Sequence, residues 1–141
     1  MFKMTFQVDY IDTDAMGVVH HASYFRWFER CRVEWLRELG MSYLEMEKEG
    51  YLLPLRSAGI TYKKPLYFDD HPEIQVCVGK LRSAGIDLLY RIYRNGELAT
   101  EGSTSHVICL RTGEGANTKL SPVRLPEKWR TVWQEQSEKK F

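Results

Sequence analysis

A change of hydrophobic period early in the chain constrains the fold more than any other feature. Apolar and polar residues alternate from Phe2 to Tyr10, which is the period of a half-buried strand. After residue 23 the apolar spacing lengthens to three or four, which forms one face of a helix that ends near Gly40. The residues on that face are Tyr24, Phe28, Cys31, Trp35 and Leu39. The pattern therefore predicts a strand over 2–10 and one long amphipathic helix over 24–39.

Most of the remaining chain has the pattern of strands. Ser42 and Glu45 have capping-box spacing, which predicts a short helix ending at Gly50. Alternating runs then predict strands near 60–63, 74–79, 86–92 and 97–110, and Asn95–Gly96 is a two-residue hairpin signal. The segment 112–122 is expected to be a loop and 126–139 a terminal helix. One long helix set apart from a run of strands indicates an α+β fold, with a mostly antiparallel sheet packed on that helix.

Small residues fill the strand over 97–110 from Gly102 to Ser105. A strand of small residues lets a bulky group come close to the sheet, and the other explanation is simply weaker packing. The sequence leaves these two interpretations open.

Length and charge exclude several classes of protein. The chain has 141 residues, which suits a single domain over 1–141. Its 20 Lys and Arg nearly balance 19 Asp and Glu, which argues against a general nucleic-acid or membrane-surface role. We find no signal peptide and no apolar run long enough for an integral membrane segment. Three cysteines without metal-ligand spacing predict reduced thiols, and we expect a cytoplasmic location.

The stretch DTDAMGVVHHASYFRWFER at 12–30 gathers the residues best suited to chemistry. Asp14 lies in a predicted loop between a strand and a helix, where functional groups are common, although a turn acid would look the same. The first backbone N–H groups of the helix, near 21–23, are unpaired and can stabilise an oxyanion. Gly17 would let a ligand approach the backbone closely.

A metal or cofactor site is not favoured. His20 and His21 are adjacent, so they point in different directions and at most one faces a small site. With Asp12 and Asp14 they could bind a metal, but the i,i+4 histidine spacing of helical metal sites is absent, and we expect none. The segment GEGAN at 113–117 lacks the known phosphate-loop patterns, and we expect no cofactor.

The pattern D-x-D-x-x-G-x-V-x-H-x-x-Y at 12–24, followed by an aromatic-rich helix, resembles the 4-hydroxybenzoyl-CoA thioesterase family and its YbgC-like acyl-CoA thioesterase branch. ITYKKPLYFDD at 60–70 and Leu125–Pro126 are similar to later family signatures. The resemblance covers nearly the whole chain. It implies a hotdog fold, in which a curved, mostly antiparallel five-stranded sheet wraps a long central helix. It also implies a homo-oligomer, a dimer or a homotetramer built as a dimer of dimers, with active sites between subunits.

The resemblance further implies hydrolysis of an acyl-CoA or aroyl-CoA thioester to the free acid and CoA. It puts the catalytic carboxylate, as base or nucleophile, on Asp14 and the oxyanion donor on the backbone N–H of His21. The substrate-binding positions that it implies are Gly17, Val19 and Tyr24, with a basic rim for the CoA phosphates near GKLRS at 79–83, which includes Lys80 and Arg82. Lys63 lies at another predicted strand end and could belong to the same rim, although Lys and Arg at strand ends are also commonly just solvated. The sequence does not decide which acyl group is hydrolysed. It also does not decide whether the thioester is carried by CoA or by an acyl-carrier protein. A non-catalytic acyl-CoA-binding or scaffold protein is the alternative.

Overall fold

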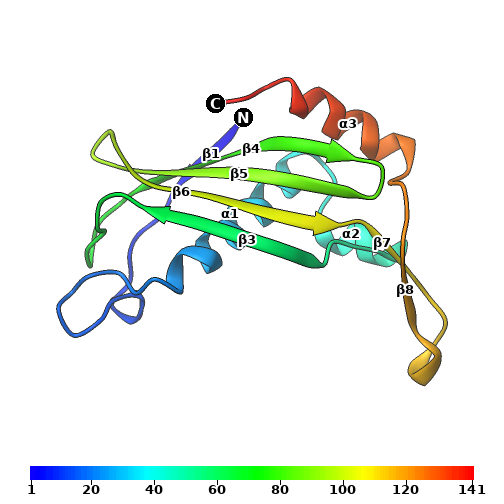
Figure 1. Cartoon of the computed structure of the whole chain (residues 1–141), viewed down its shortest axis with the longest axis horizontal. Coiled ribbons are helices and arrows are strands. Elements are labelled where there is room, and N and C mark those ends of the chain that lie inside the picture. The colour runs from blue at the N-terminus through cyan, green and yellow to red at the C-terminus, as the bar shows by residue number, and fades with distance from the viewer.

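The computed structural model describes all 141 residues and contains three α helices and two antiparallel sheets (Figure 1). The helices are α1 (Ser23–Glu38), α2 (Tyr43–Lys48) and α3 (Glu127–Ser137), and 3₁₀ turns cover Tyr10–Asp12 and Gly115–Asn117. The strands are β1 (Phe2–Thr5), β2 (Tyr51–Leu52), β3 (Leu55–Tyr62), β4 (Glu73–Arg82), β5 (Gly85–Arg94), β6 (Glu97–Val107), β7 (Cys109–Thr112) and β8 (Lys119–Pro122).

The main sheet has five strands in the order β1-β4-β5-β6-β3, and every neighbouring pair is antiparallel. A smaller sheet has the order β2-β7-β8. Helix α1 lies along one face of the main sheet, and the β7–β8 hairpin projects away from it (Figure 1). The predicted α+β class, with an antiparallel sheet on one long helix, is confirmed. Strand β3 forms one edge of the main sheet, next to the end of the molecule where α1 begins.

The close packing of α1 on the sheet explains the small residues of β6. Phe28 of α1 is fully buried and stacks on Tyr90 of β5, with ring centroids 4.4 Å apart. A Cβ atom added to Gly102 of β6 would lie 2.3 Å from Cζ of Phe28, closer than any real contact. Of the two interpretations of this stretch, close approach by a bulky group is therefore confirmed, and the group is the Phe28 ring.

Several sequence-predicted boundaries are confirmed by their local contacts. The Ser42 side chain caps α2 by accepting a hydrogen bond from the Glu45 N–H at 3.3 Å. Asn95 and Gly96 both have positive φ, 51° and 80°, as a two-residue hairpin turn requires. In α3, Trp133 is fully buried and stacks against Trp35 of α1 at 6.4 Å. No helix in the structure combines the length and apolar composition needed to cross a bilayer.

The predicted strand over 2–10 is too long. Strand β1 ends at Thr5, yet Phe6 and Val8 stay buried and their N–H groups still bond to the carbonyls of residues 72 and 70. The alternation therefore marks the buried side correctly as far as Val8. Tyr10 then turns outward and is 77% exposed, because the chain enters a 3₁₀ turn there.

The prediction that 112–122 is a loop is wrong in part, because residues 119–122 form β8 and pair with β7. All four residues of β8 are exposed, so this strand has no buried face and no hydrophobic alternation to reveal it. The predicted strand over 97–110 is also two strands. The chain leaves the main sheet at Ile108, whose N–H bonds to the Ala84 carbonyl at 2.9 Å, and β7 joins the smaller sheet.

Candidate active site

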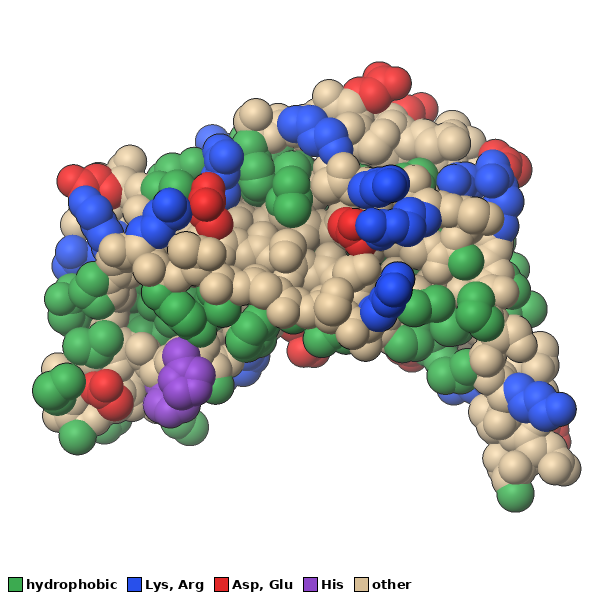
Figure 2. Space-filling model, viewed as in Figure 1, with side chains coloured by type: hydrophobic (Ala, Val, Ile, Leu, Met, Phe, Trp, Pro, Cys, Tyr) green, Lys and Arg blue, Asp and Glu red, His purple; other side chains and the backbone are tan.

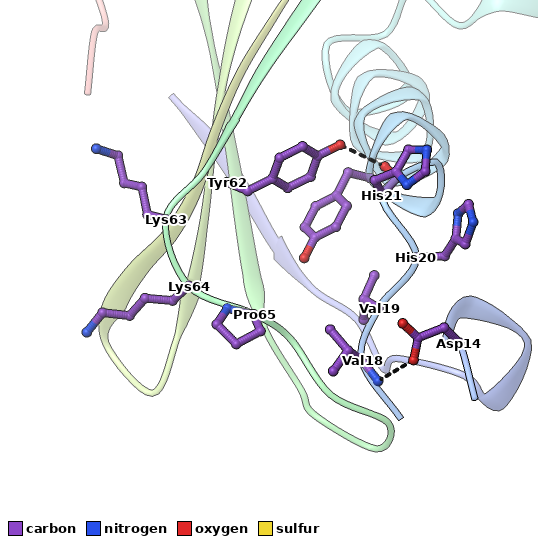
Figure 3. A pocket seen from close by; sticks show the side chains of 10 residues that line it. Asp14, Val18, Val19, His20, His21, Tyr62, Lys63, Lys64 and Pro65 are labelled. Atoms are coloured by element: carbon purple, nitrogen blue, oxygen red, sulfur yellow. Dashed lines mark hydrogen bonds between the residues drawn. The ribbon is translucent and has the colours of Figure 1, made fainter. Parts of the chain in front are cut away.

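A pocket of about 390 Å³ opens where the loop before α1 meets the end of β3 (Figure 3). Five of the sequence-predicted site residues line it together, although they come from two segments of the chain, 14–24 and 62–65. They are Asp14, Val19, His21, Tyr24 and Lys63. The other lining residues are Val18, His20, Tyr62, Lys64 and Pro65. The fold therefore brings five of the eight predicted site residues to one pocket, and Gly17, Lys80 and Arg82 lie outside its lining.

A tight turn presents Asp14 to this pocket. The Asp14 N–H bonds to the Val18 carbonyl at 2.8 Å, and the Gly17 N–H bonds back to the Asp14 carbonyl at 3.1 Å. Gly17 has a φ of 77°, a conformation that side-chain-bearing residues rarely adopt, so the turn explains the glycine. Gly17 shapes the loop from outside the lining of the pocket. An isolated bridge between Val18 and Tyr67 ties the turn to the segment after β3.

The Asp14 carboxylate is oriented through one of its two oxygens. Oδ1 accepts hydrogen bonds from the N–H groups of Met16 at 2.8 Å and Val18 at 3.3 Å (Figure 3 shows the second). No protein group donates to Oδ2. The side chain is thus held by backbone donors, while one oxygen stays available to a bound molecule.

The backbone at the start of α1 carries a free donor. The N–H of His20 bonds to the Asp12 carbonyl at 2.7 Å, and the N–H of Ser23 bonds to the His20 carbonyl at 3.0 Å. The N–H of Ala22 is 3.3 Å from Nδ1 of His20, to which it donates. The N–H of His21 lies between these three and has no acceptor in the protein. Such a donor at a helix start is suited to hold negative charge.

Asp12 has a different role from Asp14. Its side chain is 1% exposed, accepts the Asp9 N–H at 2.9 Å and pairs with Arg26 of α1. Asp12 therefore anchors the loop to the helix. No group of three or more His, Cys, Asp or Glu side chains gathers anywhere in the structure in a way that could hold a metal ion.

Two tyrosines close the inner side of the pocket. Tyr24 of α1 is buried, and its ring packs edge to face with that of Tyr62 of β3 at 5.0 Å. The Tyr62 hydroxyl donates to the His21 carbonyl at 3.0 Å (Figure 3). Our sequence prediction of the site missed Tyr62, because its partner lies 41 residues away. Its membership of the second signature, at 60–70, was the available signal.

The basic residues divide between two places. Lys63 borders the pocket and lies 3.8 Å from Glu101. Arg82 pairs with Asp87 in a second hollow, which Arg56 also lines. The Arg82 guanidinium, as a hydrogen-bond donor, holds the pKa of Asp87 below its ordinary value.

This second hollow lies on the sheet face turned to the viewer in Figure 2, where basic side chains gather around an acidic one. Lys80 sits opposite Asp87 in the register of β4 and β5. Arg56 and Tyr62 mark opposite ends of β3, about 20 Å apart at a rise of about 3.3 Å per residue. Within one chain, neither Lys80 nor Arg82 lines the pocket that holds Asp14.

Comparison with known proteins finds similarity along nearly the whole chain. Residues 8–131 match the family model described as the thioesterase-like superfamily. The acyl-CoA thioester hydrolase YbgC of Escherichia coli is 31% identical over 127 residues, which cover 90% of this chain and 91% of that protein. The acyl-CoA thioesterase YbgC of Haemophilus influenzae is 33% identical, with 89% of each chain covered. A crystal structure of a DHNA-CoA thioesterase from Staphylococcus aureus superposes with a TM-score of 0.85 at 28% identity, covering 99% of this chain and 95% of that one.

Proposed function

The chain belongs to the thioesterase-like superfamily, and from this premise we propose that Asp14 and the backbone N–H of His21 are its catalytic groups. The family resemblance and the hotdog fold expected from the sequence are confirmed by these matches, and the protein is an acyl-CoA thioester hydrolase. One observation carries the proposal: a single pocket is lined both by a residue whose carboxylate has a free oxygen, Asp14, and by a residue whose backbone N–H has no acceptor, His21.

The fixed carboxylate suits either of two routes of hydrolysis. As a general base, Asp14 takes a proton from water while the water oxygen bonds to the thioester carbon. As a nucleophile, its Oδ2 bonds to that carbon and forms an anhydride, which water then cleaves. In both routes the carbon–sulfur bond breaks and the CoA thiolate leaves and takes up a proton. The two hydrogen bonds to Oδ1 support both routes, because they orient the group and leave Oδ2 free.

Both routes place negative charge on the former carbonyl oxygen of the thioester. A preorganised N–H aimed at that oxygen stabilises the transition state more than the ground state. His21 supplies such a donor at the start of α1, where the helix dipole adds to it. The role belongs to the backbone, so the imidazole itself is expected to contribute less.

The substitution Asp14→Asn tests the assignment directly. It keeps the shape and the acceptor oxygen for the Met16 and Val18 N–H groups but removes the base or nucleophile. We expect kcat for acyl-CoA hydrolysis, followed by thiol release, to fall on the order of 10²–10⁴-fold with little change in melting temperature. Asp69→Asn makes the same chemical change outside the pocket and should keep normal turnover.

Near-normal turnover of the Asp14→Asn variant would exclude Asp14 as the catalytic group. His21→Ala is the companion variant, because it leaves the backbone N–H in place. A greater loss from His21→Ala than from Asp14→Asn would mean that the roles of the two residues are reversed.

We propose that two copies of the chain share each site. Seven of the eight residues of edge strand β3 are exposed, and an unpaired edge readily pairs with another chain. Antiparallel pairing of two β3 strands about a two-fold axis would bring the Arg56 end of one strand to the Tyr62 end of the other. The partner's Arg82 and the partner's Lys80 would then approach the pocket that contains Asp14. This arrangement explains why Lys80 and Arg82 lie apart from Asp14 in one chain.

The basic rim supports a CoA thioester as substrate. CoA carries phosphates, which Lys and Arg side chains bind by charge and hydrogen bonding. Lys63 at the pocket would act together with the partner's Arg82. The acyl group would lie against the aromatic wall that Tyr24 and Tyr62 form.

Three buried, unpaired cysteine thiols also agree with a reducing compartment, which supports our proposal of a cytoplasmic location.

A further inference from the structure

We propose that Tyr62 is a positioning residue that holds the start of α1 in the orientation that the oxyanion donor requires. The proposal rests on the proposed function of the pocket. It starts from one contact: the Tyr62 hydroxyl donates a hydrogen bond to the carbonyl of His21 at 3.0 Å (Figure 3). That contact links the last residue of edge strand β3 to the residue whose N–H is free.

The tyrosine is well placed to act as a clamp. Its ring packs against that of Tyr24, with centroids 5.0 Å apart and planes at 76°, so α1 restrains the ring from one side. Strand β6 restrains its backbone, where Tyr62 pairs with Thr100. The Tyr62 hydroxyl is protonated at neutral pH and able to donate, and partial burial raises its pKa further above the ordinary value.

The contact matters because of the two peptide groups that flank the α carbon of His21. The preceding peptide carries the free N–H, and its own carbonyl is fixed by the Ser23 N–H at 3.0 Å. The following peptide carries the His21 carbonyl, and the Tyr62 hydroxyl is its donor. The Ala22 N–H of this second peptide also donates to Nδ1 of His20, at 3.3 Å. The first peptide is therefore held by one bond and the second by two, and the orientation of the free N–H depends on both peptides.

Loss of the Tyr62 hydroxyl would act against catalysis in two ways: it would let the His21 N–H move, and it would let the His21 carbonyl turn toward the pocket. The His21 carbonyl would lose its partner, and only the longer bond from the Ala22 N–H to His20 would then resist rotation of this peptide about the α carbon. A carbonyl turned toward the pocket would present the negative end of a dipole where negative charge develops, opposite to the requirement for an oxyanion hole. Misplacement of a catalytic group by about 1 Å can cost on the order of 10²-fold in rate.

Tyr62→Phe removes the hydroxyl and keeps the ring. We expect kcat for acyl-CoA hydrolysis to fall about tenfold to a hundredfold while KM stays close to that of the wild type. The pH profile should keep its shape, because the phenol transfers no proton. Amide hydrogen exchange over residues 20–24 should become faster, as the turn before α1 loosens. Tyr93→Phe, on β5 and outside the pocket, makes the same change and should alter none of these readings.

Each other outcome overturns the proposal. An unchanged kcat with a raised KM would make Tyr62 a substrate-lining residue only. A lost basic limb of the pH profile would make it a proton donor instead. Unchanged exchange over residues 20–24 would show that the hydroxyl does not hold the turn. This exchange measurement needs no turnover, so it tests the clamp even if the Asp14→Asn variant contradicts the proposed chemistry.

Discussion

Asp12 and Asp14 are separated by one residue but lie in opposite surroundings. Asp12 is buried and paired with Arg26, whereas Asp14 is exposed and held by two backbone N–H groups at one oxygen. In an extended chain, residues two apart would share one side, so the difference comes from the turns around them. Asp12 ends the 3₁₀ turn Tyr10–Asp12, and the loop turns back just after Asp14. The motif therefore divides its two acids between anchoring the loop and facing the pocket.

A second residue-scale feature is a directional chain of hydrogen bonds in the core. Arg32 donates a hydrogen bond to the Tyr90 hydroxyl at 3.1 Å. The Tyr90 hydroxyl lies 2.8 Å from the Thr104 hydroxyl, and the Thr104 hydroxyl lies 2.9 Å from Nε2 of His106. Nδ1 of His106 lies 3.1 Å from the Leu53 carbonyl and must donate to it. Nε2 is therefore the unprotonated acceptor. Burial, and then the charge of Arg32, lower the pKa of His106 to about 4.

This lowered pKa predicts a pH-dependent stability. The unfolded chain binds the His106 proton near the ordinary pKa of 6.5, before the folded chain does, so protonation favours unfolding. The contribution of neutral His106 to the free energy of unfolding is complete above pH 6.5 and is lost as the pH falls toward 4. This contribution is about 3 kcal/mol at most. Urea unfolding at pH 7 and at pH 4.5 measures it. We expect His106→Asn to be less stable at pH 7 but to lose less on acidification.

His71→Asn is the matched control, because His71 is exposed and should leave the wild-type pH dependence unchanged. An equally steep loss of stability in the His106→Asn variant would assign the acid sensitivity to other groups.

Residues in a local motif could be predicted from the sequence, but those that act through distant contacts could not. Asp14 and His21 lie within one loop and helix start, and the motif at 12–24 that resembles the thioesterase family names them together as one candidate site. Tyr62 contacts His21 through the tertiary fold alone, and no local pattern encodes that bond. Arg82 lies in a different hollow because β4 carries it to the far end of the sheet, which its charge does not reveal.

At the scale of elements, the contact of α1 with β6 fixes the distance between helix and sheet. The absence of a side chain at Gly102 makes room for the Phe28 ring, which also stacks on Tyr90. Close-packed interiors transmit even a one-carbon change, because neighbours have no free volume into which to move. The separation between α1 and the sheet therefore depends on one glycine.

Gly102→Ala should consequently destabilise the protein by about 1–3 kcal/mol or more, as overpacking does. The added Cβ would fall 2.3 Å from the Phe28 ring, and thermal or urea unfolding measures the loss. Phe28→Leu in the same chain should recover part of it, because the smaller side chain vacates the contact. Gly59→Ala is the control, since its Cβ would be an ordinary 3.5 Å from the Ser103 side chain. Additive effects of Gly102→Ala and Phe28→Leu would contradict the contact.

Elements with one buried face were predicted more completely than elements without one, such as β3, of which only the end near 60–62 was predicted. Helix α1 and strands β4 and β5 bury alternating or periodic apolar residues, so their periods mark them in the sequence. Strand β8 has no buried residue, so its pairing with β7 leaves no hydrophobic signal. The break between β6 and β7 at Ile108 depends on a bond to Ala84 in another turn, which is again a tertiary contact.

At the scale of the whole molecule, the exposed β3 edge lies in a concavity. Figure 2 shows the lower edge of the molecule hollowed between the histidine-bearing loop at the left and a projecting arm at the right, which Figure 1 identifies as the β7–β8 hairpin. Exposed apolar side chains mark both ends of β3, where Leu55 is 58% and Tyr62 46% exposed. In a monomer, a long unpaired strand edge with exposed apolar side chains at its ends promotes aggregation with other chains. Pairing with a second copy would remove this unpaired edge.

This proposed pairing makes a quantitative prediction for mixed dimers. Chains with Asp14→Asn keep Arg82, and chains with Arg82→Ala keep Asp14, so each variant alone should hydrolyse acyl-CoA poorly at low substrate. If each site combines Asp14 of one chain with the partner's Arg82, a hybrid dimer has one intact site and one doubly altered site. Equal mixing makes about half of the dimers hybrid, so activity should recover to about a quarter of the wild-type value. The two variants are unfolded, mixed in equal amounts and refolded together, and the rate of acyl-CoA hydrolysis is then measured. Light scattering establishes the oligomeric state of the mixture. No recovery, or an active monomer, would contradict the shared site while leaving the chemistry assigned to Asp14 untouched.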